Sequence, residues 1–172
     1  MKLYICEICG DAYIGEEKPV DCPFCGAKNN FIKPGDEAKP IINEKIEISE
    51  LSKKNLMETL ALEIRANAIY LCMAGKAQEY KIKAMYKRLA KVELEHATIV
   101  TKLLGISMPE IKEETCADSD AENFNETIKL EDHAVDLYKK FTAESMEDNI
   151  RKFFGALAQV EGGHAELIKN YL

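Results

Sequence analysis

The sequence lacks the marks of several protein classes. No apolar run approaches the ~20 residues that span a bilayer, so we expect no membrane segment. No charged leader followed by an apolar stretch opens the chain, and a cytoplasmic location is the expectation. Positive charge is scarce as well: the formal net charge is −7, which argues against binding to nucleic acid.

What is present describes a soluble globular protein. Hydrophobic residues make up 47% and charged residues 31% of 172 positions, a composition typical of a folded chain. This length allows one domain of ordinary size and a small appendage. The segment from Pro34 to Pro40 is rich in breakers and charge, which predicts a boundary. We therefore divide the chain into a domain at 1–35, a linker at 36–51 and a second domain at 52–172.

The chain has six cysteines, but their placement does not suggest disulfides. Four of them form two C-x-x-C pairs near the N-terminus: Cys6, Cys9, Cys22 and Cys25. In a chain without export features, such pairs indicate metal ligation. The other two lie singly. We expect Cys72 to be a small core residue on a helix, and we assign no role to Cys116 in a connecting loop.

Residues 1–35 have the pattern of a four-thiolate metal knuckle. A glycine follows each cysteine pair and permits the positive φ of a tight turn. So short a segment cannot build a sufficient core, so a metal must hold it folded. Four sulfurs suit both zinc and iron, and both remain open. The aromatic residues Tyr4, Tyr13 and Phe31 and the Cys-Pro-Phe-Cys-Gly run make the segment resemble the rubredoxin-type iron module of rubrerythrins.

A long repeat dominates the second domain. Glu63 is followed thirty residues later by Glu93, and His96 stands three positions beyond. The same pattern recurs at a shift of 68 residues, with Glu131, Glu161 and His164. Each of the four glutamates lies in the middle of an apolar stripe with helical spacing, whereas a solvated glutamate would lie opposite. The repeat therefore predicts four helices whose glutamates face a common interior.

The expected turns place these glutamates at one depth. Hairpin turns near 79–81 and 146–148 leave each pair of glutamates at nearly equal distances from its turn. Between the hairpins, 105–121 is poor in helix signals and long enough to cross the length of the bundle. A histidine three residues after a glutamate shares its helix face, so both can bind one ion. Four carboxylates, two imidazoles and two divalent cations sum to neutrality, and these ligands suit iron or manganese.

The chain resembles the rubrerythrin family over nearly its whole length. The resemblance rests on three runs: Leu62–Tyr70, Ala90–His96 and Ala158–His164. The knuckle comes first, as in reverse rubrerythrins. The resemblance implies a mainly α fold, a ferritin-like four-helix bundle preceded by a small rubredoxin-like β domain. It also implies the iron ligands Glu63, Glu93, His96, Glu131, Glu161 and His164.

Two further tyrosines and one alanine bear on this assignment. Tyr70 and Tyr138 resemble the tyrosines that flank the iron site in the family, although a core role for them stays open. The family has an exchanging glutamate where this chain has Ala134, and Ala66 occupies the matching place in the first repeat. The six-ligand site is therefore symmetric. His133 faces away from Glu131, and we expect it at or near the surface.

The resemblance implies an oxidoreductase that reduces hydrogen peroxide or dioxygen to water in oxidative-stress defence. Electrons would pass through the knuckle iron from an external NAD(P)H-dependent reductase. Such proteins form homodimers or larger homo-oligomers. Two alternatives stay open: a ferritin-like ferroxidase or iron-storage protein, which the missing glutamate favours, and a metal-binding module with zinc in the knuckle.

Overall fold

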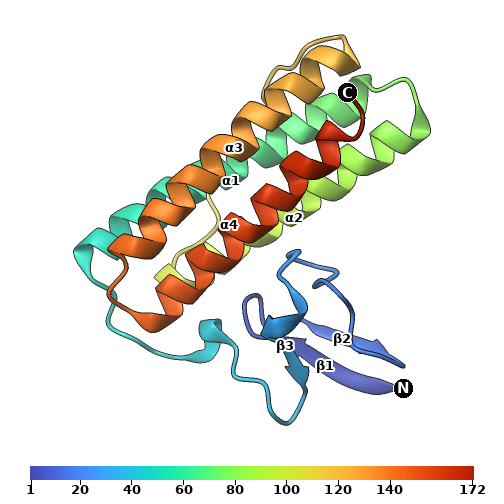
Figure 1. Cartoon of the computed structure of the whole chain (residues 1–172). Coiled ribbons are helices and arrows are strands. Elements are labelled where there is room, and N and C mark those ends of the chain that lie inside the picture. The colour runs from blue at the N-terminus through green and yellow to red at the C-terminus, as the bar shows by residue number, and fades with distance from the viewer.

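The protein is a four-helix bundle with a small three-stranded sheet against its side (Figure 1), and its computed structural model describes all 172 residues. The sheet consists of β1 (Lys2–Cys6), β2 (Ala12–Gly15) and β3 (Ile32–Pro34), in the order β2-β1-β3. The helices are α1 (Glu50–Lys76), α2 (Tyr80–Leu104), α3 (Asp120–Glu144) and α4 (Asp148–Lys169). The predicted fold class is confirmed. No helix has the length and apolar character needed to cross a membrane.

The helices form two antiparallel hairpins, α1–α2 and α3–α4, whose turns fall where the sequence predicted them (Figure 1). The side chain of Ser49 caps α1 by accepting a hydrogen bond from the Ser52 amide. Gly105 ends α2 in the left-handed conformation, with φ +66°. From there the segment 105–119, which we call the crossover, runs along the bundle to the start of α3. This crossover makes α2 and α3 parallel and brings the two repeats face to face.

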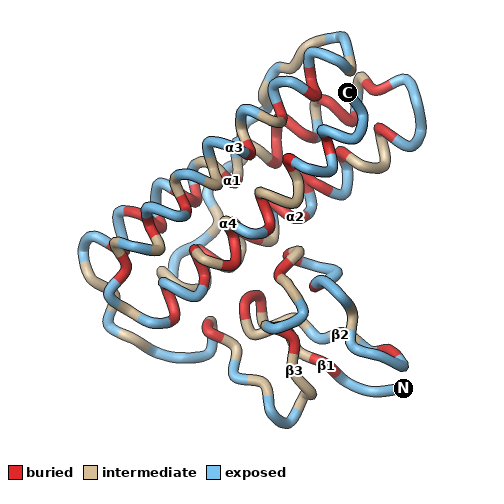
Figure 2. The backbone as a smooth tube through the Cα atoms, in the orientation of Figure 1, coloured by how far each residue is buried: buried red, intermediate tan, exposed pale blue.

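Buried residues line the inward faces of all four helices (Figure 2). One hydrophobic cluster continues from the bundle into the knuckle, since Ile8 of the knuckle and Ile41 of the linker share it with Ala97 of α2 and Phe153 of α4. The knuckle therefore shares its apolar core with the bundle of its own chain.

Specific contacts also fix the knuckle on α2 and α4. The Arg88 guanidinium of α2 donates to the carbonyl oxygen of Phe24 at 3.0 Å and to that of Pro23. Gly26 lies so close to α4 that a Cβ atom there would stand 2.9 Å from Val160 Cγ1. Gly26 also has φ +77°, so its lack of a side chain serves both the turn and the contact.

The expectation for the two single cysteines was wrong. Cys72 of α1 and Cys116 of the crossover form a disulfide, with Cα atoms 6.0 Å apart. The reason is the path of the crossover, which returns along α1 and brings residues 44 positions apart into contact. The sequence shows that such a crossover is long enough, but it does not show which helix the crossover follows.

Candidate metal centres

The four knuckle cysteines converge on one point. All are buried, and all four sulfurs lie within 4.8 Å of one another. The Sγ atoms are 3.8 Å apart for Cys6 and Cys25, and 3.7 Å for Cys9 and Cys22. Ligand bonds of about 2.3 Å in a tetrahedron place sulfurs about 3.8 Å apart. None of the four is in a disulfide. The spacing therefore fits a single tetrahedral metal ion.

The turns around the sulfurs follow from the glycines. Gly10 has φ +82°, and its amide donates to the Cys6 carbonyl at 2.8 Å. Gly26 repeats this geometry with a bond of 3.0 Å to the Cys22 carbonyl. In addition, the Asp11 amide donates to Cys9 Sγ at 3.5 Å. An amide directed at the sulfur stabilises a thiolate ligand.

The structure also brings the six bundle residues into one buried cluster, with one glutamate from each helix. They form two groups within 4.8 Å, and Glu93 and Glu161 belong to both. The first group adds Glu63 and His96, and the second adds Glu131 and His164. Each shared carboxylate gives one oxygen to each group: Glu161 Oε1 lies 3.2 Å from His96 Nδ1, and Oε2 lies 3.0 Å from His164 Nδ1. Two shared carboxylates, with one further glutamate and one histidine on each side, fit a pair of metal ions.

The donor atoms of this cluster lack partners within the protein. Both oxygens of Glu93, both oxygens of Glu161 and the Nδ1 atoms of His96 and His164 are buried without a hydrogen bond. They approach one another to 3.0–3.3 Å, but without hydrogen-bond geometry. Unsatisfied buried polar atoms are costly, and lone pairs that converge on a common point satisfy a cation instead. This arrangement fits metal binding.

The charges of the cluster lead to the same conclusion. Burial raises the pKa of Glu63 and of Glu131 to about 8. Burial also opposes ionisation of Glu93, but His164 and His96 hold its pKa at about 2. Although burial lowers it, the carboxylates raise the pKa of His96 well above its usual value. In the metal-free protein the cluster therefore binds protons as its counter-charge, and divalent cations can replace them.

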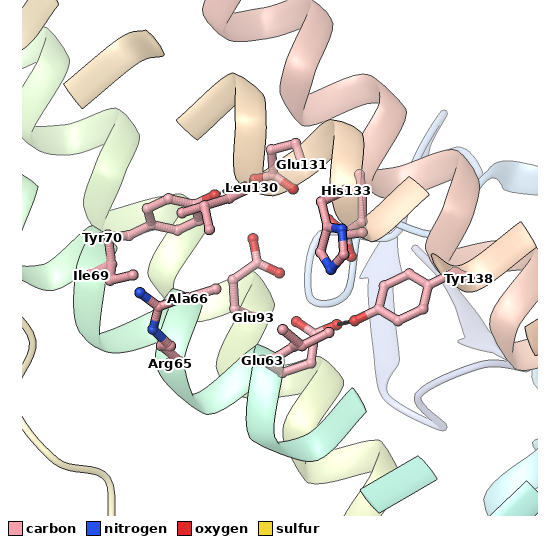
Figure 3. Close-up of a pocket in the computed structure, with 13 residues that line it drawn as sticks. Glu63, Arg65, Ala66, Ile69, Tyr70, Glu93, Leu130, Glu131, His133 and Tyr138 are labelled. Carbon is pink, nitrogen blue, oxygen red and sulfur yellow. Dashed lines mark hydrogen bonds between the residues drawn. The ribbon is translucent and has the colours of Figure 1, made fainter. Parts of the chain in front are cut away.

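Two tyrosines complete the cluster by reaching across the repeats. The Tyr70 hydroxyl of α1 donates to Glu131 Oε1 of α3 at 2.5 Å. The Tyr138 hydroxyl of α3 donates to Glu63 of α1 (Figure 3). Burial and the adjacent carboxylates raise the pKa of both tyrosines well above 10. The sequence pointed to these tyrosines but did not show that each bonds the glutamate of the opposite repeat.

A cavity of about 40 Å³ opens beside the cluster between α1 and α3 (Figure 3). Its lining includes Ala66 and Ala134, the two positions without the additional glutamate. Arg65 and His133 also border it and are exposed, as expected for His133. On the same measure about 10–15 Å³ holds one water molecule, so only a small molecule fits beside the carboxylates.

The two centres are connected through one histidine. His96 presents Nδ1 to the carboxylates, and its Nε2 lies 2.9 Å from the carbonyl oxygen of Cys25. A carbonyl can only accept, so Nε2 is the donor, and this leaves Nδ1 as the metal-facing atom. No sequence signal revealed this contact, because it depends on where the knuckle docks.

Comparisons with known proteins agree with this description. The rubrerythrin family model matches residues 54–172. Reverse rubrerythrin-1 of Clostridium acetobutylicum is 35% identical over 114 residues, which cover 61% of this chain and 63% of that protein. The solved structure of a hypothetical protein from Pyrococcus furiosus shares the fold, with a TM-score of 0.59 and 19% identity over 70% of this chain and 87% of the other. With its cysteine knuckle placed before a four-helix bundle, the chain belongs to the rubrerythrin family.

Proposed function

We propose that this protein reduces hydrogen peroxide, or dioxygen, to water at the bundle cluster, with electrons relayed through the knuckle. The hydrogen bond between His96 and Cys25 carries this proposal, since it joins the two centres within one chain. The knuckle, residues 1–35, is then the relay, and 52–172 the reducing domain, with 36–51 between them. An NAD(P)H-dependent reductase is the expected external donor.

Each centre takes the metal that its ligands suit. We assign one iron to the four cysteines and two to the cluster formed by Glu63, Glu93, His96, Glu131, Glu161 and His164. When bound, the iron pair supplies the two electrons that cleave an O–O bond, and the knuckle iron supplies one-electron transfer. Zinc in the knuckle or manganese in the cluster would bind to the same atoms but would change the redox chemistry.

The His96 ring offers a short covalent and hydrogen-bonded route for electrons. One ring nitrogen faces the cluster, and the other donates to the carbonyl oxygen of Cys25, whose own sulfur is a knuckle ligand. The ring is fully buried, so no water interrupts this contact. The relay lies within one chain, so transfer along it does not require a partner subunit.

The residues around the cavity can also hold protons close to the cluster. Reducing one peroxide molecule to two waters consumes two protons together with two electrons. Tyr138 holds a proton at the Glu63 carboxylate, and Tyr70 holds one at Glu131. Because burial keeps both tyrosines protonated, they act as hydrogen-bond donors at neutral pH. The small cavity restricts the site to a small oxidant.

One observation favours a second function, iron oxidation for storage. Ala66 and Ala134 leave a symmetric cluster of six protein ligands, without a seventh that exchanges. Such a site suits repeated binding and release of iron. The fused knuckle favours the first function, because a storage protein needs no electron relay.

An anaerobic single-turnover experiment tests the proposal. We would reduce the iron-loaded protein, add one equivalent of peroxide and follow the absorption of both centres. The knuckle iron should become oxidised as peroxide disappears. Arg88→Ala loosens the docked knuckle without touching a ligand and should slow that oxidation, whereas the exposed neighbour Lys87→Ala should not. A knuckle that stays reduced while peroxide is consumed would refute the relay, and many irons retained per chain would favour storage.

A further inference from the structure

The Cys72–Cys116 disulfide has no part in the proposed function. It joins α1, near the C-terminal end of that helix, to the crossover, separate from the knuckle, whose four cysteines remain unbridged. The bond connects the first hairpin to the segment that leads into the second. One covalent bond can therefore determine whether the crossover is held against α1.

The crossover has few other attachments. None of its residues from 105 to 119 is buried. Between Ser107 and Cys116 it makes no backbone–backbone hydrogen bond. Its other polar contacts include hydrogen bonds between Ala117 and Asn123 at the start of α3, and contacts with two side chains of α1. Lys76 Nζ lies 2.6 Å from the Cys116 carbonyl oxygen and 2.7 Å from Asp118, while Arg65 Nε lies 3.5 Å from Glu114. Exposed ion pairs contribute little, so the disulfide is the main anchor.

The anchored part of the crossover reaches the opening beside the cluster. Arg65 borders the cavity that leads to the carboxylates (Figure 3). It also borders the surface groove that contains Cys116. Ile69 lines both as well. Glu114 pairs with Arg65 from a position only two residues before Cys116. The disulfide thus fixes the group that holds the guanidinium at the edge of the opening.

Both sulfurs belong to half-buried residues that line surface grooves. Cys72 lies in a groove with Leu71 and Ile111, and Cys116 in the groove described above. A small thiol can therefore approach from two sides. Lys76 donates to the Cys116 carbonyl oxygen and so places a positive charge close to this residue.

We propose that Cys72 and Cys116 form a reversible thiol–disulfide site that fastens the crossover to α1 when oxidised and frees it when reduced. Reduction uses a dithiol: its first thiolate displaces one cysteine sulfur, its second releases the other, and the dithiol leaves as a disulfide with two electrons transferred. Hydrogen peroxide reverses the change. One cysteine thiolate attacks a peroxide oxygen and the O–O bond breaks, which gives a sulfenic acid and a hydroxide that takes up the proton lost by the thiol to become water. The second thiol then attacks the sulfenic sulfur, and a second water leaves as the disulfide forms.

Release of the crossover removes Glu114 from Arg65 and leaves the guanidinium at the edge of the opening free to move. This consequence rests on the proposed function of the cluster as a metal site, whereas the thiol exchange does not. It makes the protein responsive to the oxidant that it consumes, since oxidation restrains a side chain at the opening and reduction frees it.

Limited proteolysis of the metal-loaded protein tests the site. The exposed crossover glutamates Glu110 and Glu113 are targets for a glutamate-specific protease. Dithiothreitol should increase cleavage there on the order of tenfold. The Cys72→Ser/Cys116→Ser variant should be cut at the faster rate with or without dithiothreitol. Alkylation and peptide mapping should find both cysteines blocked before reduction and free after it, and blocked again after peroxide is added.

Equal cleavage of the oxidised, reduced and variant proteins would overturn the proposal. So would complete alkylation of both cysteines in unreduced protein. The rate at which a chelator removes the bundle metal measures how accessible the cluster is. This rate should be several-fold faster in the double variant. An unchanged rate would refute the link to the opening. If the bundle bound no metal, the proposed function would be refuted instead, whereas the comparison of cleavage rates would still test the thiol–disulfide site.

Discussion

The buried glutamates should destabilise the metal-free bundle, and Glu63→Gln tests this directly. Burial raises the pKa of Glu63 to about 8, while in the unfolded chain it has its ordinary value near 4.5. Between these values the folded protein holds a proton that the unfolded chain releases. The stability that this group contributes is present below pH 4.5 and is lost as the pH rises toward 8.

The size of the effect follows from that interval. One pH unit across it is worth about 1.4 kcal/mol, and the slope is smaller close to each pKa, so wild type should lose roughly 3.5 kcal/mol relative to Glu63→Gln between pH 5 and pH 8. Glutamine has the same shape, accepts the Tyr138 hydrogen bond and carries no titrating charge. The metal-free variant should therefore be the more stable protein at pH 8, although it has lost a ligand.

Urea unfolding at the two pH values measures this difference, after a chelator has removed the bundle metal and left the knuckle metal in place. The exposed Glu58→Gln on the same helix is the control and should follow wild type. In the metal-loaded state the order should reverse, with Glu63→Gln the less stable protein, because the ion now supplies the counter-charge. Parallel pH profiles for wild type and Glu63→Gln would refute the reasoning.

Three other predictions follow from the same contacts. Cys72→Ala/Cys116→Ala should lower the stability by about 4 kcal/mol, since the bond closes a loop of 44 residues, and the melting temperature in calorimetry by about 10 °C. A loss of stability smaller than about 1 kcal/mol would contradict this prediction. Cobalt binding to the metal-free bundle should release protons into weak buffer, because Glu131 as well as Glu63 must ionise. For the same reason its affinity should increase as the pH rises toward 8. Cobalt uptake without proton release would be inconsistent with the raised pKa values. Gly26→Ala should separate the knuckle from α4, and proteolysis of the linker should increase while the cysteine metal stays bound; an unchanged cleavage rate would show that the contact does not hold the knuckle.

The sequence was sufficient to predict the bundle and the composition of both centres. A glutamate in the middle of an apolar stripe is a strong signal, because burial without a partner is so costly that chance rarely places four in register. The spacing of the cysteine pairs is equally informative, since two residues between cysteines determine which sulfurs can share an ion. These predictions rest on contacts within single helices and turns.

The contacts that the sequence did not reveal are those between elements. The bond from His96 to Cys25 and the bridge from Cys72 to Cys116 both depend on how a connecting segment places distant parts of the chain against a helix. Linker length limits such arrangements without selecting one. The cysteine at 116 was also overlooked because a lone cysteine in a polar loop has no partner visible in its own neighbourhood.

The docked knuckle makes the two halves of the cluster unequal. The repeat gives each metal position the same ligands, yet His96 is fully enclosed beneath Cys25, while the His164 side chain remains 11% exposed. Identical ligands in different surroundings exchange at different rates. We expect the ion beside His164 to exchange faster in both directions, so duplication has produced a pair whose members differ in how readily each ion is replaced.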